Sequence, residues 1–234
     1  MAPSQEIEIK LGDWISNGFK LFGNQWQQWC LVSLVALLIM FGSMLCLFIP
    51  LLFVSGALMH SLFYIAFKNL KGESFSVQDV FYGFKNRYWD FTKLMMIITG
   101  VSLLLFVIPY GMFIGGVLMA EKLGPLFAFG GFGIFFLAIL CFIVLSFYFS
   151  PRIMLMLPIM VDKGLPIRES YHLADSLCRK KFWWLLLFSL IANFISSVGI
   201  YACYIGYIAT FPLFYTITIA AYQDLLMKDA PPAA

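Results

Sequence analysis

Residues 30–40 of the chain read CLVSLVALLIM, and no Asp, Glu, Lys or Arg interrupts this apolar run. The run belongs to a longer stretch, residues 31–67, that is free of those four residue types. About 20 helical residues cross a hydrocarbon core of ~30 Å, so this stretch suits two crossings joined by a turn. We predict helices because the run lacks the alternation of barrel strands, and because a helix pairs its own backbone groups in lipid.

The composition supports a membrane protein. Of the 234 residues, 62% are hydrophobic and 12% are charged, and the mean hydropathy is +0.91. Soluble domains average about 45–50% apolar and about 25% charged residues. These values argue against a disordered chain, a nucleic-acid-binding domain, a disulfide-rich secreted module and a soluble enzyme.

Three further charge-free stretches cover residues 94–120, 123–151 and 182–223. By length, the first two predict one crossing each and the last predicts two. We therefore predict an all-α polytopic membrane protein, a single integral membrane domain over residues 1–234 with six transmembrane helices. The predicted spans are Trp29–Leu47, Leu51–Asn69, Phe91–Pro109 (which could run on to Ala120), Phe127–Phe149, Phe182–Cys203 and Tyr207–Leu226.

The basic residues set the predicted orientation. Six crossings place all Lys and Arg residues on one side except Lys122. The positive-inside rule makes the populated side cytoplasmic, so we expect a cytoplasmic (inner) membrane protein with both termini in the cytoplasm. Tryptophans flank the cytoplasmic ends of the spans, as interfacial anchors would. They are Trp14, Trp26, Trp29, Trp89, Trp183 and Trp184.

Three cytoplasmic segments carry an apolar stripe at helical spacing: residues 11–26, 76–90 and 166–180. Ser76 and Asp79 have the spacing of a capping box, and Asp175 and Arg179 form an i,i+4 pair on the polar face of their segment. We predict three amphipathic helices lying at the membrane interface, each leading into a helical hairpin. This order of features, together with a Gly-Phe-Lys tripeptide at 18–20 and 83–85, predicts pseudo-repeats at about 8–70, 74–150 and 165–228.

Arg152 is a candidate site residue with two interpretations. If the fourth span ends at Ser150, Arg152 lies at the interface and its side chain snorkels. If the span instead runs from about residue 134 to 161, Arg152 is up to ~15 Å deep and needs a carboxylate, a carbonyl cluster or a lipid phosphate. We treat it as a possible lipid- or partner-binding residue.

His60 is the one ionisable side chain deep within a predicted span, which makes it a second candidate for lipid or partner binding. The alternative is a neutral histidine that only packs against a neighbouring helix. Small residues spaced by four allow close helix contacts, and we predict such contacts at Gly111, Gly115, Ala202 and Gly206.

The sequence contains no recognisable motif for catalysis, phosphate binding or metal binding. We therefore predict a non-catalytic membrane protein with no cofactor. It would serve as a scaffold, an accessory subunit of a membrane complex or a lipid-organising component, with membrane lipids and other membrane subunits as partners. The alternative is a transporter or binding protein for a lipid-like or hydrophobic solute, with Arg152 meeting an anionic headgroup.

The segment 152–183 resembles a stretch found in polytopic bacterial membrane proteins, among them the membrane domain beside some glycerophosphodiester phosphodiesterases. That pattern has an Arg, an apolar run with Pro, an acidic residue and then Glu-Ala, Ser, Leu, Gly and Phe-Trp before a span. Ser170 and Ala174 stand where Ala and Ser are usual, and Lys180 stands where Gly is usual. The resemblance implies a six-span helical membrane fold without catalysis. The matching residues are Arg152, Pro158, Asp162, Glu169, Leu177, Phe182 and Trp183.

Overall fold

A computed structural model describes residues 10–45, 49–123, 126–201 and 205–227, and within these ranges the chain is helical with no strand. The helices are α1 (Leu11–Asn24), α2 (Trp26–Leu45), α3 (Ile49–Leu70), the 3₁₀-helix η1 (Val77–Phe81), α4 (Tyr82–Lys85), α5 (Tyr88–Leu123), α6 (Leu126–Asp162), α7 (Ile167–Lys180), α8 (Phe182–Tyr201), α9 (Ile205–Thr210), α10 (Leu213–Tyr222) and the π-helix η2 (Gln223–Met227).

Five of these helices are long and apolar enough to cross a membrane, as the prediction of a helical membrane protein requires. The sixth predicted span is divided. Phe211 and Pro212 separate α9 from α10, because proline has no N–H for the helical ladder and restricts the residue before it. The five candidate spans are Trp26–Leu45, Pro50–Leu70, Tyr88–Leu118, Phe129–Asp162 and Phe182–Tyr201.

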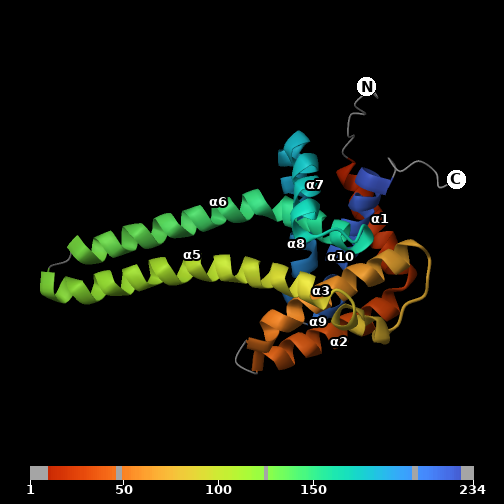
Figure 1. The fold of residues 1–234 in the computed structure, drawn as a ribbon, viewed down its shortest axis with the longest axis horizontal. Helices are drawn as coiled ribbons and strands as arrows, with labels where there is room; N and C mark the ends of the chain where they lie inside the picture. Colours follow the sequence, from red (N-terminus) through yellow and green to blue (C-terminus); the bar gives the residue numbers. More distant parts are fainter. Residues whose placement is uncertain (1–9, 46–48, 124–125, 202–204, 228–234) are drawn as a thin grey trace.

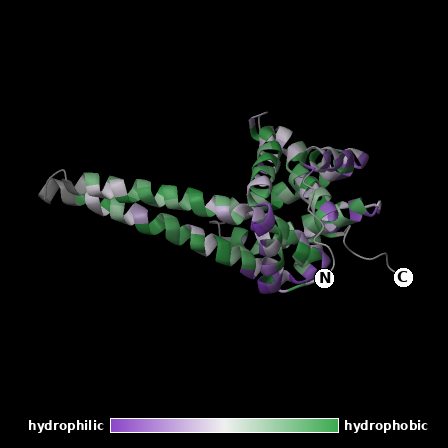
Figure 2. Ribbon diagram, turned by 90° about the horizontal axis from the view of Figure 1, so that it is seen from above, coloured by the Kyte–Doolittle hydropathy of each residue, from purple (hydrophilic) through white to green (hydrophobic). Residues whose placement is uncertain are grey.

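The longest elements form a hairpin that projects from the rest of the molecule (Figure 1). Helices α5 and α6 contain 36 and 37 residues, so each is about 54 Å long. Helix α5 runs through Pro109 and past the predicted end of the third span, and α6 runs through Pro151 and Pro158 to Asp162. Figure 2 shows hydrophobic residues along this hairpin, whereas the hydrophilic residues are concentrated in the body from which the hairpin projects.

The body is built around three buried segments that contact one another, and we call them the hub: residues 57–67 of α3, 153–161 of α6 and 213–222 of α10. Their apolar side chains are almost wholly buried. Helix α10 is buried on nearly every face. It is therefore a core helix of the body and not a lipid-facing one.

The amphipathic segments pack against the hub through part of their apolar stripes, while Trp26 and Phe81 remain exposed. Helix α1 packs on α10, η1 and α4 pack on α3, and α7 packs on α6. Two stripe residues of α1, Trp14 and Gly18, are buried in these contacts, as are Ala174 and Cys178 of α7. The hub therefore covers part of each stripe, because a stripe shows that a face is buried but not what covers it. The position of these helices at a membrane interface stays a prediction.

The second amphipathic segment also differs in shape from its prediction. Instead of one helix over 76–90, the chain forms η1 and α4, and α5 begins at Tyr88. This segment runs back beside α3: Asp79 pairs with Lys68 near the end of that helix, and the Gly83 amide donates to Ser61 Oγ at 2.8 Å, two turns earlier. A Cβ on Gly83 would clash with the Ala57 carbonyl oxygen, so glycine permits this close approach.

Candidate functional site

Arg152 lies in a closed ionic cluster between α6, α7 and α8. Its guanidinium Nε donates to Asp175 Oδ1 at 2.8 Å, and Nη1 donates to the Tyr148 carbonyl oxygen. Its Cζ lies 3.8 Å from the Tyr148 ring centroid and 5.3 Å from that of Phe182. Helix α6 is continuous to Asp162 and Arg152 is only 3% exposed, so the arginine is buried within the protein. Its depth in a membrane stays a prediction.

Asp175 completes the cluster with a second cation. Arg179 Nε donates to its other oxygen, Oδ2, at 2.7 Å. The predicted i,i+4 pair is thus present, but Asp175 is buried against Arg152 and does not lie on a solvated face. The hydrogen bond from Arg152, together with Arg179, lowers the pKa of Asp175 below its ordinary value. Each carboxylate oxygen accepts one hydrogen bond from an arginine, so this group joins α6 to α7.

Cys178 lies on the same buried face of α7, one turn beyond Ala174. Its side chain is fully buried. Burial raises its pKa to about 11, which keeps it protonated and unreactive at neutral pH.

His60 sits in an aromatic cage on α3. Its ring stacks on Phe91 with a centroid separation of 4.2 Å and meets Tyr82 edge-on at 5.5 Å. Its Nδ1 has no hydrogen-bond partner among the described residues. Arg152 contacts α7 and α8, whereas His60 contacts α4 and α5, so their described contacts do not bring the two candidates together.

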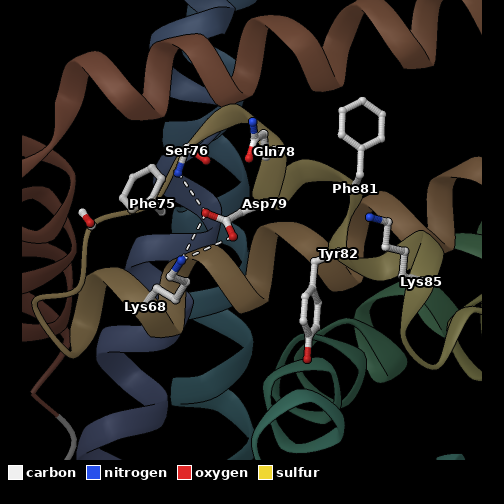
Figure 3. A pocket seen from close by; sticks show the side chains of 9 residues that line it. Lys68, Phe75, Ser76, Gln78, Asp79, Phe81, Tyr82 and Lys85 are labelled. Atoms are coloured by element: carbon white, nitrogen blue, oxygen red, sulfur yellow. Dashed lines mark hydrogen bonds and ion pairs between the residues drawn. The ribbon is translucent and has the colours of Figure 1, made fainter.

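A polar cavity of about 340 Å³ lies where η1 and α4 pack beside the end of α3 (Figure 3). Lys68 Nζ binds both oxygens of Asp79, at 3.3 and 3.2 Å, and Asp79 accepts the Ser76 backbone amide at 2.9 Å. The capping box was predicted from the sequence, but the cavity was not. Its walls come from segments up to 17 residues apart, Lys68 to Lys85, and local spacing does not show that these meet.

Arg87 is a structural residue that the sequence did not single out. It has a left-handed backbone with φ of 50°, which an L-residue rarely adopts. Its guanidinium donates to Asp90 and to the carbonyl oxygens of Met160 and Leu165, at 2.9 to 3.0 Å. The side chain therefore ties the start of α5 to the end of α6. No local sequence pattern indicates this role, because the two carbonyl acceptors belong to residues more than 70 positions away.

Only some of the small residues predicted at helix contacts lie at one. A Cβ at Gly111 or Gly115 would meet nothing within 4 Å, so these two do not mark a helix contact. The close approach of α5 and α6 falls instead at Gly131, whose Cβ would come within 3.2 Å of the Phe113 carbonyl oxygen. Gly206 does lie at a contact, because its backbone abuts Gly199 of α8. Ala202 lies outside the described residues.

The tryptophans divide into two groups. Trp14 and Trp29 are buried, at 1% and 0% exposure, so the prediction of interfacial anchors was wrong for both. Trp14 packs edge-on against Phe188, and its indole N–H donates to Asp224 at 2.8 Å. The remaining four are more than half exposed and their role as anchors stays a prediction: Trp26, Trp89, Trp183 and Trp184.

Within the described residues, no group of three or more His, Cys, Asp and Glu side chains is arranged to hold a metal ion. Comparison of the chain with known protein families, curated proteins and solved structures finds no match.

Proposed function

We propose that the chain is a non-catalytic integral membrane protein that serves as a scaffold or accessory subunit of a membrane complex. The observation that carries the proposal is the projecting α5–α6 hairpin (Figure 1). Its large apolar residues are exposed along both helices, and the described remainder of the chain packs mainly at its hub end. Such an apolar surface requires lipid or the helices of another subunit.

The charged groups of the body support a non-catalytic role. Arg152 is neutralised by Asp175, Lys68 by Asp79, and Arg87 is bound to Asp90 and to backbone carbonyls. A catalytic acid or base must reach its substrate with a free lone pair or proton. Here the ion pairs are used to hold helices against the hub.

The proposal includes the finer architecture of six crossings in three pseudo-repeats, with α9 and α10 together forming the sixth crossing. Contacts around the hub support it. Each amphipathic segment packs on the returning helix of the preceding hairpin, and α1 completes the cycle by packing on α10. A polar bond accompanies each pairing: Lys68 with Asp79, Arg152 with Asp175, and Trp14 with Asp224 of η2, the segment that directly follows α10. We place the protein in the cytoplasmic membrane, with both termini inside.

Purification from membranes in a mild detergent tests the proposal. We expect native mass spectrometry to show a complex larger than the chain. Leu104→Trp on the hairpin should release the partner, whereas Leu38→Trp on α2, which is equally exposed, should not. A lone monomer without partner or bound lipid would contradict the proposed role.

The alternative function, a binding protein or transporter for a lipid-like solute, was predicted with Arg152 as the group that meets an anionic headgroup. The ion pair with Asp175 does not favour that role for Arg152. Unchanged lipid binding in Arg152→Ala would separate that residue from any lipid site.

A further inference from the structure

A second, apolar cavity of about 460 Å³ opens between α5 and α6 where the two helices leave the body. Its walls are residues 94–105 of α5 and 142–156 of α6, and Ile167 and Tyr171 of α7 close one end. The volume lies within the ~300–1,000 Å³ typical of small-molecule sites. The lining is almost wholly aliphatic and aromatic, with serines 102, 146 and 150 as the exceptions in the two long walls.

The groove is continuous with the apolar surface of the hairpin. Wall residues such as Ile97, Val101 and Phe149 are themselves exposed, and outward-facing residues such as Leu104 and Val144 flank them on the same helices. In a membrane, an occupant would enter directly from the hydrocarbon region. That route favours a flexible apolar chain over a water-soluble ligand.

The α7 end of the groove is polar and positively charged. Tyr171, Asp175 and Arg179 follow one another at four-residue spacing along α7, and Arg179 Nε donates to Asp175 Oδ2 at 2.7 Å. Arg179 is 76% exposed, and it is followed by Lys180 and Lys181. The segment carries two acidic residues: Asp175 is bound by two arginines, and Glu169 is outnumbered by Arg168, Arg179, Lys180 and Lys181. A negative headgroup would therefore meet excess positive charge at this end.

We infer that the groove binds one acyl chain of an anionic phospholipid, with the phosphate near Tyr171 and Arg179. The site needs no protein partner, so it is independent of the proposed scaffold function. This site differs from the predicted lipid site at Arg152. In the structure, Arg152 is bound to Asp175 and joins α6 to α7.

Photocrosslinking of the full chain in nanodiscs tests the groove. The probe is phosphatidylglycerol with a diazirine in its acyl chain, diluted into phosphatidylcholine. We expect adducts on Ser102, Ser146 and Phe149 to exceed those on Leu104 and Val144 by at least about threefold. Equal labelling of the two groups would overturn the site, because ordinary lipid contact does not distinguish groove from outer surface.

Filling the groove should remove the bound lipid. Ser146→Trp is expected to lower the phosphatidylglycerol retained in native mass spectra by at least about threefold. The matched control is Val144→Trp, two residues away on α6 and outside the lining, which should retain the lipid. Ser102→Trp fills the groove from α5 and replaces the first variant if that one does not fold. Undiminished retention in a folded groove variant would overturn the proposal.

The headgroup is tested separately with the same probe. Phosphatidylglycerol should outcompete phosphatidylcholine in the wild-type groove, and Arg179→Gln should abolish this preference while the chain adducts persist. Equal competition by the two lipids in the wild type would overturn the assignment of an anionic lipid. Because the purified chain is used, the absence of a partner subunit would not affect either result.

Discussion

The guanidinium of Arg152 donates to the carboxylate of Asp175 at 2.8 Å, joining α6 to α7 across 23 positions of sequence. Both side chains are buried, at 4% and 10% exposure. Removing one member of a buried pair leaves the other charge unpaired, whereas replacing both by apolar residues is often neutral. The contribution of the pair to stability must therefore be tested by replacing both residues as well as each one alone.

Asp175→Asn should destabilise the protein by about 3 kcal/mol, because Arg152 then stays buried without a counter-charge. The combined change Arg152→Met and Asp175→Leu should recover most of that loss. The measurement is thermal unfolding in detergent, followed by helical circular dichroism. Arg179→Gln is the control and should cost under about 1 kcal/mol, since Arg179 is exposed. If the double variant is no more stable than Asp175→Asn, the two residues are not coupled.

The same carboxylate predicts a dependence of stability on pH. The folded state lowers the pKa of Asp175 below the unfolded value of about 3.9, so its stabilisation is present above that value. It is lost as the pH falls through the lowered folded pKa. The contribution of Asp175 should thus be constant from pH 7 to 5 and decline below about pH 4. Melting curves of the wild type should fall toward those of Asp175→Asn in that acidic range. A gap between the two proteins that stays constant down to pH 2 would show that Asp175 does not titrate in this way.

Gly18 of α1 predicts a second effect on stability. A Cβ there would lie 2.5 Å from Ile217 Cγ1 and 2.6 Å from Ile217 Cα, and a backbone atom of the buried α10 cannot easily move. Gly18→Ala should cost about 1–3 kcal/mol through overpacking. Gly12→Ala on the same helix meets nothing within 4 Å and should be neutral or stabilise by up to about 1 kcal/mol. Chemical denaturation of both variants makes the comparison, and equal effects would mean that α1 does not approach α10 so closely.

Arg87 predicts an unusual order among substitutions. Arg87→Ala removes the donors to Met160 and Leu165 and should cost about 2 kcal/mol or more. Arg87→Gly loses the same bonds but accepts the left-handed backbone, so it should be about 1 kcal/mol less destabilising than Arg87→Ala. Lys85→Ala is the exposed neighbouring control and should stay within about 0.5 kcal/mol of the wild type. Thermal melting compares the stabilities of the three variants. A melting temperature of Arg87→Gly below that of Arg87→Ala would contradict the strained backbone at this position.

Particular elements show how far local sequence information extends. Helices α2 and α8 lie close to their predictions because a charge-free run of about 20 residues is a local property. Helix α7 (Ile167–Lys180) lies within one residue of the predicted segment 166–180, because its apolar spacing is also a local property. The sixth predicted span was wrong as a single helix, since an apolar run does not reveal that Pro212 interrupts it or that α10 lies in the core.

Only part of the candidate site could be predicted from the sequence. The sequence singled out Arg152 and required a carboxylate, a carbonyl cluster or a phosphate for it, and the structure supplies a carboxylate and a carbonyl. Which carboxylate could not be deduced, because Asp175 also fits a solvated i,i+4 pair with Arg179. The aromatic cage of His60 and the groove between α5 and α6 depend on helix positions that no spacing rule gives.

Composition and the distribution of charge by themselves determined that the chain is helical and that five of its helices are long and apolar enough to cross a membrane, because hydropathy is a local property of the chain. Only the tertiary structure decided that the amphipathic segments cover a central hub, that Arg152 is neutralised by Asp175 and that a groove opens beside Tyr171. These features depend on contacts between distant segments. An apolar stripe or a charge in an apolar run indicates that a partner is needed. Which segment provides that partner depends on how the whole chain packs.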